Sequence, residues 1–179
     1  MKTFFSENHI EIYNNVLTKD ECQFYIDKVN NSDKCYKNDT GNYRGIALNL
    51  YEEPTLLNSL RRGKDEYIKK HSFLDLMPCA WELDYACNVQ KYSPGMAYGG
   101  EHMERSYNCN RMLVWMFYLN TIKEGGGTYW PQQKFKSKPR QGSLIMWPAD
   151  WTHSHLGIVS NKQEKYIITG WYCYTKKED

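Results

Sequence analysis

The spacing of apolar positions along the chain changes near residue 85. Before that point, Thr18-Lys19-Asp20-Glu21 has the form of a capping box, in which a threonine and a glutamate three residues later bond the first N–H groups of a helix. Phe24, Tyr25 and Val29 follow at helical spacing, so the pattern predicts a helix that begins there. A loop rich in Asn, Asp, Lys and Gly is expected over residues 30–43.

A second helix is predicted from about Pro54 to about Lys70. Proline is accepted in the first turn of a helix, where its missing N–H would have no partner in any case. The helix would carry one apolar stripe, formed by Leu56, Leu57, Leu60, Tyr67 and Ile68. We therefore expect the first half of the chain to be largely helical.

After about Tyr85 the pattern consists of short apolar runs that are separated by turn residues. Such runs predict strands, and several strands at close spacing with no helix between them are typical of a sandwich or barrel. The predicted strands are Cys87–Tyr92, Arg111–Asn120, Thr128–Pro131, Gln133–Lys136, Ser143–Trp147 and Lys165–Tyr174. The expected fold is mainly β, with a jelly-roll-like core and two helices packed on its outside.

The composition fits a single globular domain and disfavours several other classes of protein. The chain has 179 residues, of which 15% are aromatic, as suits a β-rich core. A net charge of +2 is too small to indicate nucleic acid as a partner. The longest apolar run has eight residues, whereas a membrane helix needs roughly 20. Neither a nucleic-acid nor a membrane partner is therefore expected.

The cysteines and the N-terminal residues indicate in which cellular compartment the protein is expected. The six cysteines form no C-x-x-C pair, which disfavours a zinc ribbon or a redox motif. The first residues meet charge at once and lack the apolar stretch of a signal peptide. We therefore expect a soluble, cytoplasmic protein. Frequent Asn, Lys, Tyr and Ile indicate an AT-rich genome, which favours a microbial or viral source.

Two of the five histidines precede a glutamate by two positions, in His9-Ile10-Glu11 and His102-Met103-Glu104. The first motif lies in a polar N-terminal arm, whereas the second follows a Gly-Gly turn at the edge of the β region. On a strand, residues i and i+2 project to one face, so the side chains of the second motif could bind one metal ion. A further histidine, His153 or His155, would complete a facial triad of the kind that suits Fe(II). The alternative for His102 is a solvated surface histidine.

His153-Ser154-His155 and Lys165 are further candidates, each with an alternative. The histidine pair has the form of a cupin metal motif, but cupins place that pair before the carboxylate, and here the order is reversed. Lys165 opens the last predicted strand and is followed by Tyr166-Ile167-Ile168. A lysine there is commonly a solvated edge charge, but one whose stem enters the core would need an anionic partner, such as the distal carboxylate of an organic acid.

Residues 88–179 resemble the Fe(II)- and 2-oxoglutarate-dependent dioxygenases, specifically the prolyl 4-hydroxylase-like family. The resemblance rests on a succession of short motifs in the family's order over about half of the chain. These are Gln90-Lys91-Tyr92-Ser93-Pro94-Gly95, His102-x-Glu104, Arg111 with Tyr118-Leu119-Asn120, Gly125-Gly126-Gly127-Thr128, Gly142-Ser143-Leu144-Ile145, His155-Leu156-Gly157, Lys165-Tyr166 and Trp171. The family's fold is a double-stranded β-helix, so the resemblance implies one domain over 1–179, with 1–84 as helical support and 85–179 as the β-helix core.

The resemblance implies that His102 and Glu104 are the first two iron ligands, although the family usually has aspartate at the second position. For the third ligand, the ten-residue step to Lys165 and the Leu-Gly that follows favour His155. The short distance from Trp147-Pro148 favours His153 instead. We choose His155.

The family pattern also implies a co-substrate pocket. Lys165 matches the basic residue that pairs with the C5 carboxylate of 2-oxoglutarate, and Tyr92 and Tyr118 match tyrosines that line the pocket. Arg111 and Trp171 match positions near the substrate, with a strand-edge arginine and a core tryptophan as the alternatives. Aromatic side chains would exclude water, with Trp147, Trp151 and Trp171 as candidates.

The implied function is hydroxylation of an unactivated C–H bond, with Fe(II), 2-oxoglutarate and O2 required and ascorbate as a possible reductant. The expected substrate is a peptidyl proline or another amino-acid side chain, in a protein, a peptide or a small amino-acid-like molecule. The loops Met96–Glu101 and Ser106–Asn110 would select it. Two alternatives are a catalytically idle jelly-roll binding module and a cupin-like metal enzyme that does not use 2-oxoglutarate.

Overall fold

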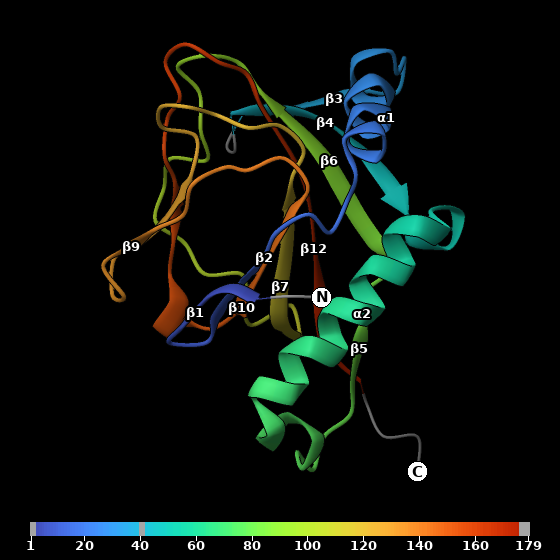
Figure 1. Ribbon diagram of the computed structural model, residues 1–179, viewed down its shortest axis with the longest axis vertical. Coiled ribbons are helices and arrows are strands. Elements are labelled where there is room, and N and C mark those ends of the chain that lie inside the picture. The colour runs from blue at the N-terminus through green and yellow to red at the C-terminus, as the bar shows by residue number, and fades with distance from the viewer. Residues whose placement is uncertain (1–2, 40–41, 176–179) are drawn as a thin grey trace.

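The computed structural model describes residues 3–39 and 42–175 and has a large antiparallel sheet as its central element (Figure 1). Met1, Lys2 and residues 40–41 of the predicted loop lie outside the described residues. Along the sheet the strands follow the order β1-β2-β10-β7-β12-β6-β4-β3, and β5 pairs with β12. A small sheet has the order β11-β8-β9. Their bounds are β1 Thr3–Glu7, β2 Ile10–Tyr13, β3 Tyr36–Asn38, β4 Tyr43–Asn49, β5 Trp81–Leu83, β6 Ala86–Tyr92, β7 Arg111–Tyr118, β8 Thr128–Trp130, β9 Phe135–Lys136, β10 Ser143–Pro148, β11 Leu156–Gly157 and β12 Lys165–Tyr174.

The two predicted helices are confirmed, as α1 Lys19–Asn30 and α2 Pro54–Lys70. The capping box forms, because the Thr18 hydroxyl accepts a hydrogen bond from the Glu21 N–H while the Glu21 carboxylate accepts one from the Thr18 N–H. Phe24 does not join the buried face of α1 and is 55% exposed. Short 3-10 turns occur at Leu50–Glu52, Ser72–Asp75 and Trp151–His153. Within the described part of the chain, no helix is long and apolar enough to cross a bilayer.

The first half of the chain contains strands, so the expectation that it would be largely helical is wrong. β1 and β2 form a hairpin that extends one side of the sheet through β2 and β10, and β4 extends the other side through β6. The predicted loop over 30–43 contains β3, which pairs with β4. Of these strands, β2 and β4 join the sheet through β10 and β6, which lie far away in the sequence, and the residues of the strands themselves carry little of the signal.

Side chains along the central strands alternate between two apolar clusters. On β7, Leu113, Trp115 and Phe117 belong to the cluster that also contains the buried residues of both helices. Val114, Met116 and Tyr118 belong to the second cluster, which lies on the opposite face together with Trp130 of the small sheet. Figure 1 shows α1 and α2 on one side of the large sheet and β9 on the other. The functional residues lie among the second cluster, away from the helices.

A buried carboxylate fixes the β1–β2 hairpin against α2. Glu11 of β2 is 0% exposed, and its oxygens contact the Ser6 hydroxyl at 2.6 Å and the Lys70 ammonium at 3.0 Å. The His71 ring lies 3.0 Å from the same carboxylate and 3.2 Å from the His9 ring. The polar N-terminal arm that the sequence predicts around His9 is therefore an ordered hairpin, and its His-x-Glu motif is structural.

Gly170 sits where any side chain would meet the core. A Cβ at this position of β12 would lie 2.4 Å from Cζ2 of Trp115 and 3.1 Å from Cβ of Cys87. We expect Gly170→Ala to lower the free energy of unfolding by about 1–3 kcal/mol, the usual cost of overpacking a core. Gly99→Ala is the matched control, since its Cβ would have only one neighbour within 4 Å, at 3.9 Å. Urea denaturation of both variants measures the difference. Equal stability would contradict the expectation and show that the Trp115 side chain can move to accommodate the extra methyl group.

Candidate active site

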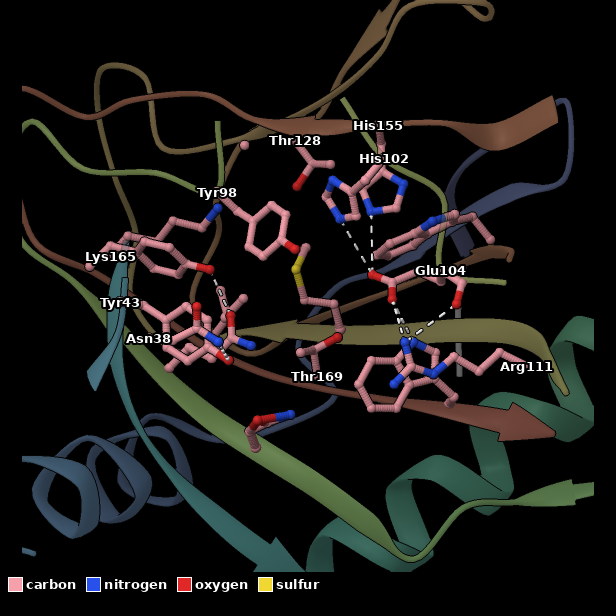
Figure 2. Close-up of a pocket in the computed structure, with 18 residues that line it drawn as sticks. Asn38, Tyr43, Tyr98, His102, Glu104, Arg111, Thr128, His155, Lys165 and Thr169 are labelled. Atoms are coloured by element: carbon pink, nitrogen blue, oxygen red, sulfur yellow. Dashed lines mark hydrogen bonds and ion pairs between the residues drawn. The ribbon is translucent and has the colours of Figure 1, made fainter. Parts of the chain in front are cut away.

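Three side chains converge at the mouth of a cavity of about 210 Å³ (Figure 2). They are His102, Glu104 and His155, and one ligand atom from each lies within 4.8 Å of the other two. His102 and His155 pair through both backbone hydrogen bonds in an isolated bridge, and the Glu104 N–H bonds to the carbonyl of Ala149 after β10. The first two residues therefore do not lie on a regular strand, but their two-residue spacing still puts both side chains on one side of the backbone.

Both imidazoles have a fixed orientation. Nδ1 of His102 lies 2.8 Å from the carbonyl oxygen of Gly100, and Nδ1 of His155 lies 3.0 Å from that of His153. A carbonyl oxygen can only accept, so each Nδ1 carries a proton and donates. In the neutral ring the other nitrogen, Nε2, then presents a lone pair. Both Nε2 atoms face Oε1 of Glu104 at 3.6 Å.

The chemistry of this donor set suits a metal cation. Two lone pairs and a carboxylate oxygen point at one another, an arrangement that is repulsive unless a proton or a cation lies between them. Burial raises the pKa of the Glu104 carboxyl, but the two imidazoles, which donate to it through Nε2 when they are protonated, outweigh burial and hold that pKa well below its ordinary value. A metal cation would take the place of those protons. Two imidazoles and one carboxylate form the facial donor set that suits Fe(II) and leaves coordination positions open. The three residues therefore fit an iron ion.

His153 does not face this donor set, because both of its ring nitrogens are used elsewhere. Nε2 donates to the backbone carbonyl of Asn8 at 2.6 Å, and Nδ1 lies 3.0 Å from the Thr152 hydroxyl. Burial lowers the pKa of His153, which agrees with a neutral ring that fixes the turn of the β1–β2 hairpin. The structure therefore gives no support to a cupin-like His153/His155 pair.

Aromatic rings enclose His155, which is 5% exposed. Trp147 meets the imidazole edge to face at a centroid distance of 5.0 Å, and Trp130 lies at 6.1 Å. Tyr98 lies over the other imidazole, His102, at 4.2 Å. Of the tryptophans expected to exclude water, Trp147 and Trp171 line the cavity, whereas Trp151 is 67% exposed and does not.

The second carboxylate oxygen of Glu104 has two donors of its own. Oε2 accepts from Nη1 of Arg111 at 3.1 Å and from the indole N–H of Trp171 at 3.1 Å. Arg111 and Trp171 both line the cavity. The family resemblance implied that they lie near the substrate. Their polar groups, however, are directed at Glu104.

Lys165 lies across the cavity from the three converging side chains (Figure 2). It begins β12 on the face that carries Ile167, Thr169 and Trp171, all of which line the same cavity. The side chain is 5% exposed, and within residues 3–39 and 42–175 it makes no hydrogen bond or ion pair. Burial alone lowers the pKa of its ammonium to about 8. A buried cation of this kind requires an anionic partner.

The two predicted pocket tyrosines have different positions. Tyr92 lines the cavity, with its ring centroid 5.4 Å from the Lys165 ammonium. Tyr118 is not among the lining residues; its ring lies 5.6 Å from the ammonium, and its hydroxyl bonds to Thr128 and Ser137. Several polar lining residues on β3, β4, β6 and β8 were not predicted from the sequence, namely Asn38, Tyr43, Asn88, Gln90 and Thr128. Alternation along β6 was the available signal for Asn88 and Gln90, since both share a face with Tyr92.

One protein-family model matches the part of the chain that contains the site. The model described as the 2OG-Fe(II) oxygenase superfamily, where 2OG is 2-oxoglutarate, matches residues 87–173. Over this region, which is just under half of the chain, the sequence is similar to the 2OG-Fe(II) oxygenase superfamily. The family uses Fe(II), 2-oxoglutarate and O2, and the chain is a dioxygenase of this kind. A search of curated protein sequences finds no match.

Solved structures of prolyl hydroxylases share the fold of this oxygenase. The viral collagen prolyl hydroxylase of Paramecium bursaria Chlorella virus-1, solved with 2-oxoglutarate, has a TM-score of 0.73 at 19% identity and covers 92% of this chain and 96% of its own. A prolyl-4-hydroxylase of Pseudomonas putida has a TM-score of 0.70 at 16% identity, covering 94% of each chain. A Trichoplax adhaerens prolyl hydroxylase bound to a hypoxia-inducible-factor peptide has a TM-score of 0.71 at 18% identity, covering 93% and 84%. The expected jelly-roll fold is confirmed.

The buried, unpaired ammonium of Lys165 is expected to lower the free energy of unfolding of the protein without ligand. An unfolded lysine has a pKa near 10.5, so the folded oxygenase binds fewer protons than the unfolded chain between about pH 8 and 10.5. Burying the charge therefore destabilises the fold fully below pH 8, and the penalty falls as pH rises through that window. We expect Lys165→Met to raise the free energy of unfolding at pH 7, by up to about 3 kcal/mol.

Urea denaturation at pH 7 and pH 10 checks this expectation, with a smaller gain at the higher pH. Lys123→Met, at an exposed lysine, is the matched control and should change stability little. A Lys165→Met variant less stable than the wild type at pH 7 would contradict the account of an unpaired buried charge.

Proposed function

We propose that this oxygenase hydroxylates an unactivated C–H bond of an amino-acid side chain, with a peptidyl proline as the first candidate. His102, Oε1 of Glu104 and His155 would hold Fe(II), and Lys165 would bind the distal carboxylate of 2-oxoglutarate. The observation that carries the proposal is that one cavity holds both a set of metal-binding donor atoms and a buried ammonium without an anionic partner. Convergent lone pairs lie on one side of it and a buried, unpaired ammonium on the other.

The metal ion supplies redox chemistry, coupling the oxidative decarboxylation of 2-oxoglutarate by O2 to oxidation of the substrate. The residues of the chain supply binding and orientation. The carbonyls of Gly100 and His153 hold the two imidazoles in the tautomer whose Nε2 is free to bind a metal. Carbonyl acceptors of this kind raise the affinity of a histidine ligand by fixing its ring.

The co-substrate would give Lys165 the anionic partner that the described residues of the protein do not provide. Its ammonium lies near the rings of Tyr92 and Tyr118, which offer only cation–π attraction at 5.4 and 5.6 Å. A carboxylate would supply a charge-assisted hydrogen bond and offset the cost of burial. Binding one end of 2-oxoglutarate here directs its other end toward His102, Glu104 and His155.

The aromatic walls would exclude water from the reaction. Trp130 and Trp147 are 0% and 2% exposed and surround His155, and the Tyr98 ring covers His102. Excluding water strengthens the electrostatic interactions in the cavity and protects reactive species from side reactions. The substrate would then enter past the loops Met96–Glu101 and Ser106–Asn110.

Support for a peptide substrate comes from the shared fold and from exposed apolar side chains near the site. The prolyl hydroxylases of similar fold include one solved with a peptide. In the two candidate substrate loops Met96 is 48% exposed and Tyr107 99% exposed, and Met103 beside the ligand pair is 48% exposed. In this proposal these exposed side chains would contact the peptide on its way to the cavity. Ascorbate is proposed as the reductant that keeps the iron ferrous.

Fe(II)-dependent formation of succinate from 2-oxoglutarate, with a proline-rich peptide as substrate, tests the proposal. Lys165→Met removes a hydrogen bond to a charged group, and we expect the KM for 2-oxoglutarate to rise roughly 10- to 100-fold. Because the lysine must be charged to bind the carboxylate, the wild-type KM should be constant below about pH 8 and rise above it. Lys165→Arg, which stays charged, should show no such rise.

The outcomes separate the proposal from its alternatives. Succinate formation that is unaffected by Lys165→Met would favour a metal enzyme that does not anchor 2-oxoglutarate here. Iron binding with no succinate would favour an idle binding module. Succinate formation with a peptide hydroxylated at a residue other than proline would retain the enzyme class and change the substrate.

The two late histidines give a matched pair of variants for the third ligand. We expect His155→Ala to weaken Fe(II) binding at least 100-fold in anaerobic equilibrium dialysis, because it removes one of three protein ligands. His153→Ala should retain Fe(II) binding within a few-fold. It should instead lower the melting temperature, because it frees the Asn8 carbonyl that the ring contacts. The reverse result would assign the third ligand to His153.

A further inference from the structure

We propose that Arg111 and Trp171 are positioning residues, which bind Oε2 of Glu104 and so reserve Oε1 for the metal ion. The inference rests on the proposed metal site and goes beyond it, because it assigns a separate task to each carboxylate oxygen. It also gives these two residues a role different from substrate contact. We call them the Arg111–Trp171 pair.

The pair forms one rigid unit around the carboxylate. The guanidinium carbon of Arg111 lies 3.4 Å from the ring centroid of Trp171, so the two groups are stacked. Each donates to Oε2 of Glu104 at 3.1 Å, and Arg111 also donates to the Glu104 backbone carbonyl at 3.3 Å. Neither donor reaches Oε1, which faces the two imidazoles. Figure 2 shows Arg111 on the side of Glu104 away from His102 and His155.

An irregularity in the sheet places Arg111 in the cavity. Along the β7–β12 pair, Val114 is opposite Trp171 and Leu113 is opposite Tyr172, but Cys173 is opposite Arg111. Met112 is thus an extra residue on β7, as in a β-bulge. Without the extra residue, strict alternation would put position 111 on the face of Leu113, toward the helices. The bulge instead turns Arg111 to the side of Trp171.

The pair explains how a glutamate serves at a position where the family pattern has aspartate. A carboxylate with both oxygens free can bind a metal through either oxygen or through both. With Oε2 held by two donors, one oxygen is left, and with two imidazoles it makes three protein ligands. Three positions of an octahedral ion then stay open. Aspartate is one methylene shorter, about 1.5 Å, and could not reach both the histidines and the pair.

Co(II) binding to the 179-residue chain tests the inference without relying on activity. Trp171→Phe removes the N–H that reaches Oε2 while it keeps an aromatic ring beside Arg111, and Trp151→Phe is the matched control at a tryptophan that is 67% exposed. Arg111 is a less direct probe, because removing its positive charge by itself favours a nearby cation. We expect Trp171→Phe to weaken Co(II) binding roughly 10- to 100-fold, as for other groups that orient a metal ligand, and Trp151→Phe to leave it unchanged.

Glu104→Asp provides a second test that does not depend on Trp171. We expect it to weaken Co(II) binding at least tenfold, although aspartate is the family's usual residue. Trp171→Phe should then have little additional effect in the Glu104→Asp background, since the coupling between the two positions is already lost. The visible absorption of bound Co(II), which reports coordination number, should change in both single variants.

Two results would overturn the inference. In the first, Trp171→Phe binds Co(II) like the wild type while Glu104→Asp binds it as well or better. In the second, the two substitutions weaken binding additively, which would show that the positions act independently. A wild type that binds no Co(II) would overturn the proposed metal site, and the inference with it. Melting temperatures of all variants separate a loss of metal binding from a loss of folding.

Discussion

The alternation of side chains along β12 is the constraint on which both the fold and the site depend. One face of this strand carries Tyr166, Ile168 and Tyr172 into the cluster beneath the helices. The other face carries Lys165, Thr169 and Trp171 into the cavity. A shift of one residue in register would exchange the two sets and put the ammonium into the apolar cluster. Pairing with β6, β7 and β5 holds the register along the strand.

The cavity contains two polar groups that lack partners of opposite kinds: one lacks a cation and the other lacks an anion. Near its mouth, Oε1 of Glu104 faces two imidazole nitrogens with no donor between them. At the other side, Lys165 is a donor with no acceptor among the described residues. In the proposed function, a metal cation would complete the first group, and 2-oxoglutarate would bind that cation with one end and Lys165 with the other. The buried, unpaired ammonium costs folding free energy, which a bound anion would offset.

Much of the site could be predicted from the sequence because the family's motifs are local. His102-x-Glu104 and the lysine at the start of the last strand are recognisable from their neighbours alone. The choice between His153 and His155 was less clear, because both have similar neighbours. The contacts that occupy the His153 ring come from Thr152 and from Asn8, which is 145 positions away. The contacts of Arg111 with Glu104 were out of reach, because they depend on a bulge between two strands.

The elements of the fold also divide into those that local sequence predicts and those that depend on distant residues. Both helices carried their signals within their own sequence, a capping box in α1 and a first-turn proline with an apolar stripe in α2, and α2 begins and ends at the predicted residues. β1 to β4 did not: β1, β2 and β3 have only three to five residues, and β2 and β4 are held in the sheet by the distant strands β10 and β6. Their absence from the predicted pattern also hid the lining residues Asn38 and Tyr43, which these strands carry.

Anaerobic titration of the apoprotein with Fe(II) and then 2-oxoglutarate tests the central claim most directly. If one cavity holds both, a visible metal-to-ligand charge-transfer band appears only when both are present, and it saturates at one equivalent of 2-oxoglutarate. Iron that binds without such a band on adding 2-oxoglutarate would contradict the account, because the co-substrate would then not reach the metal.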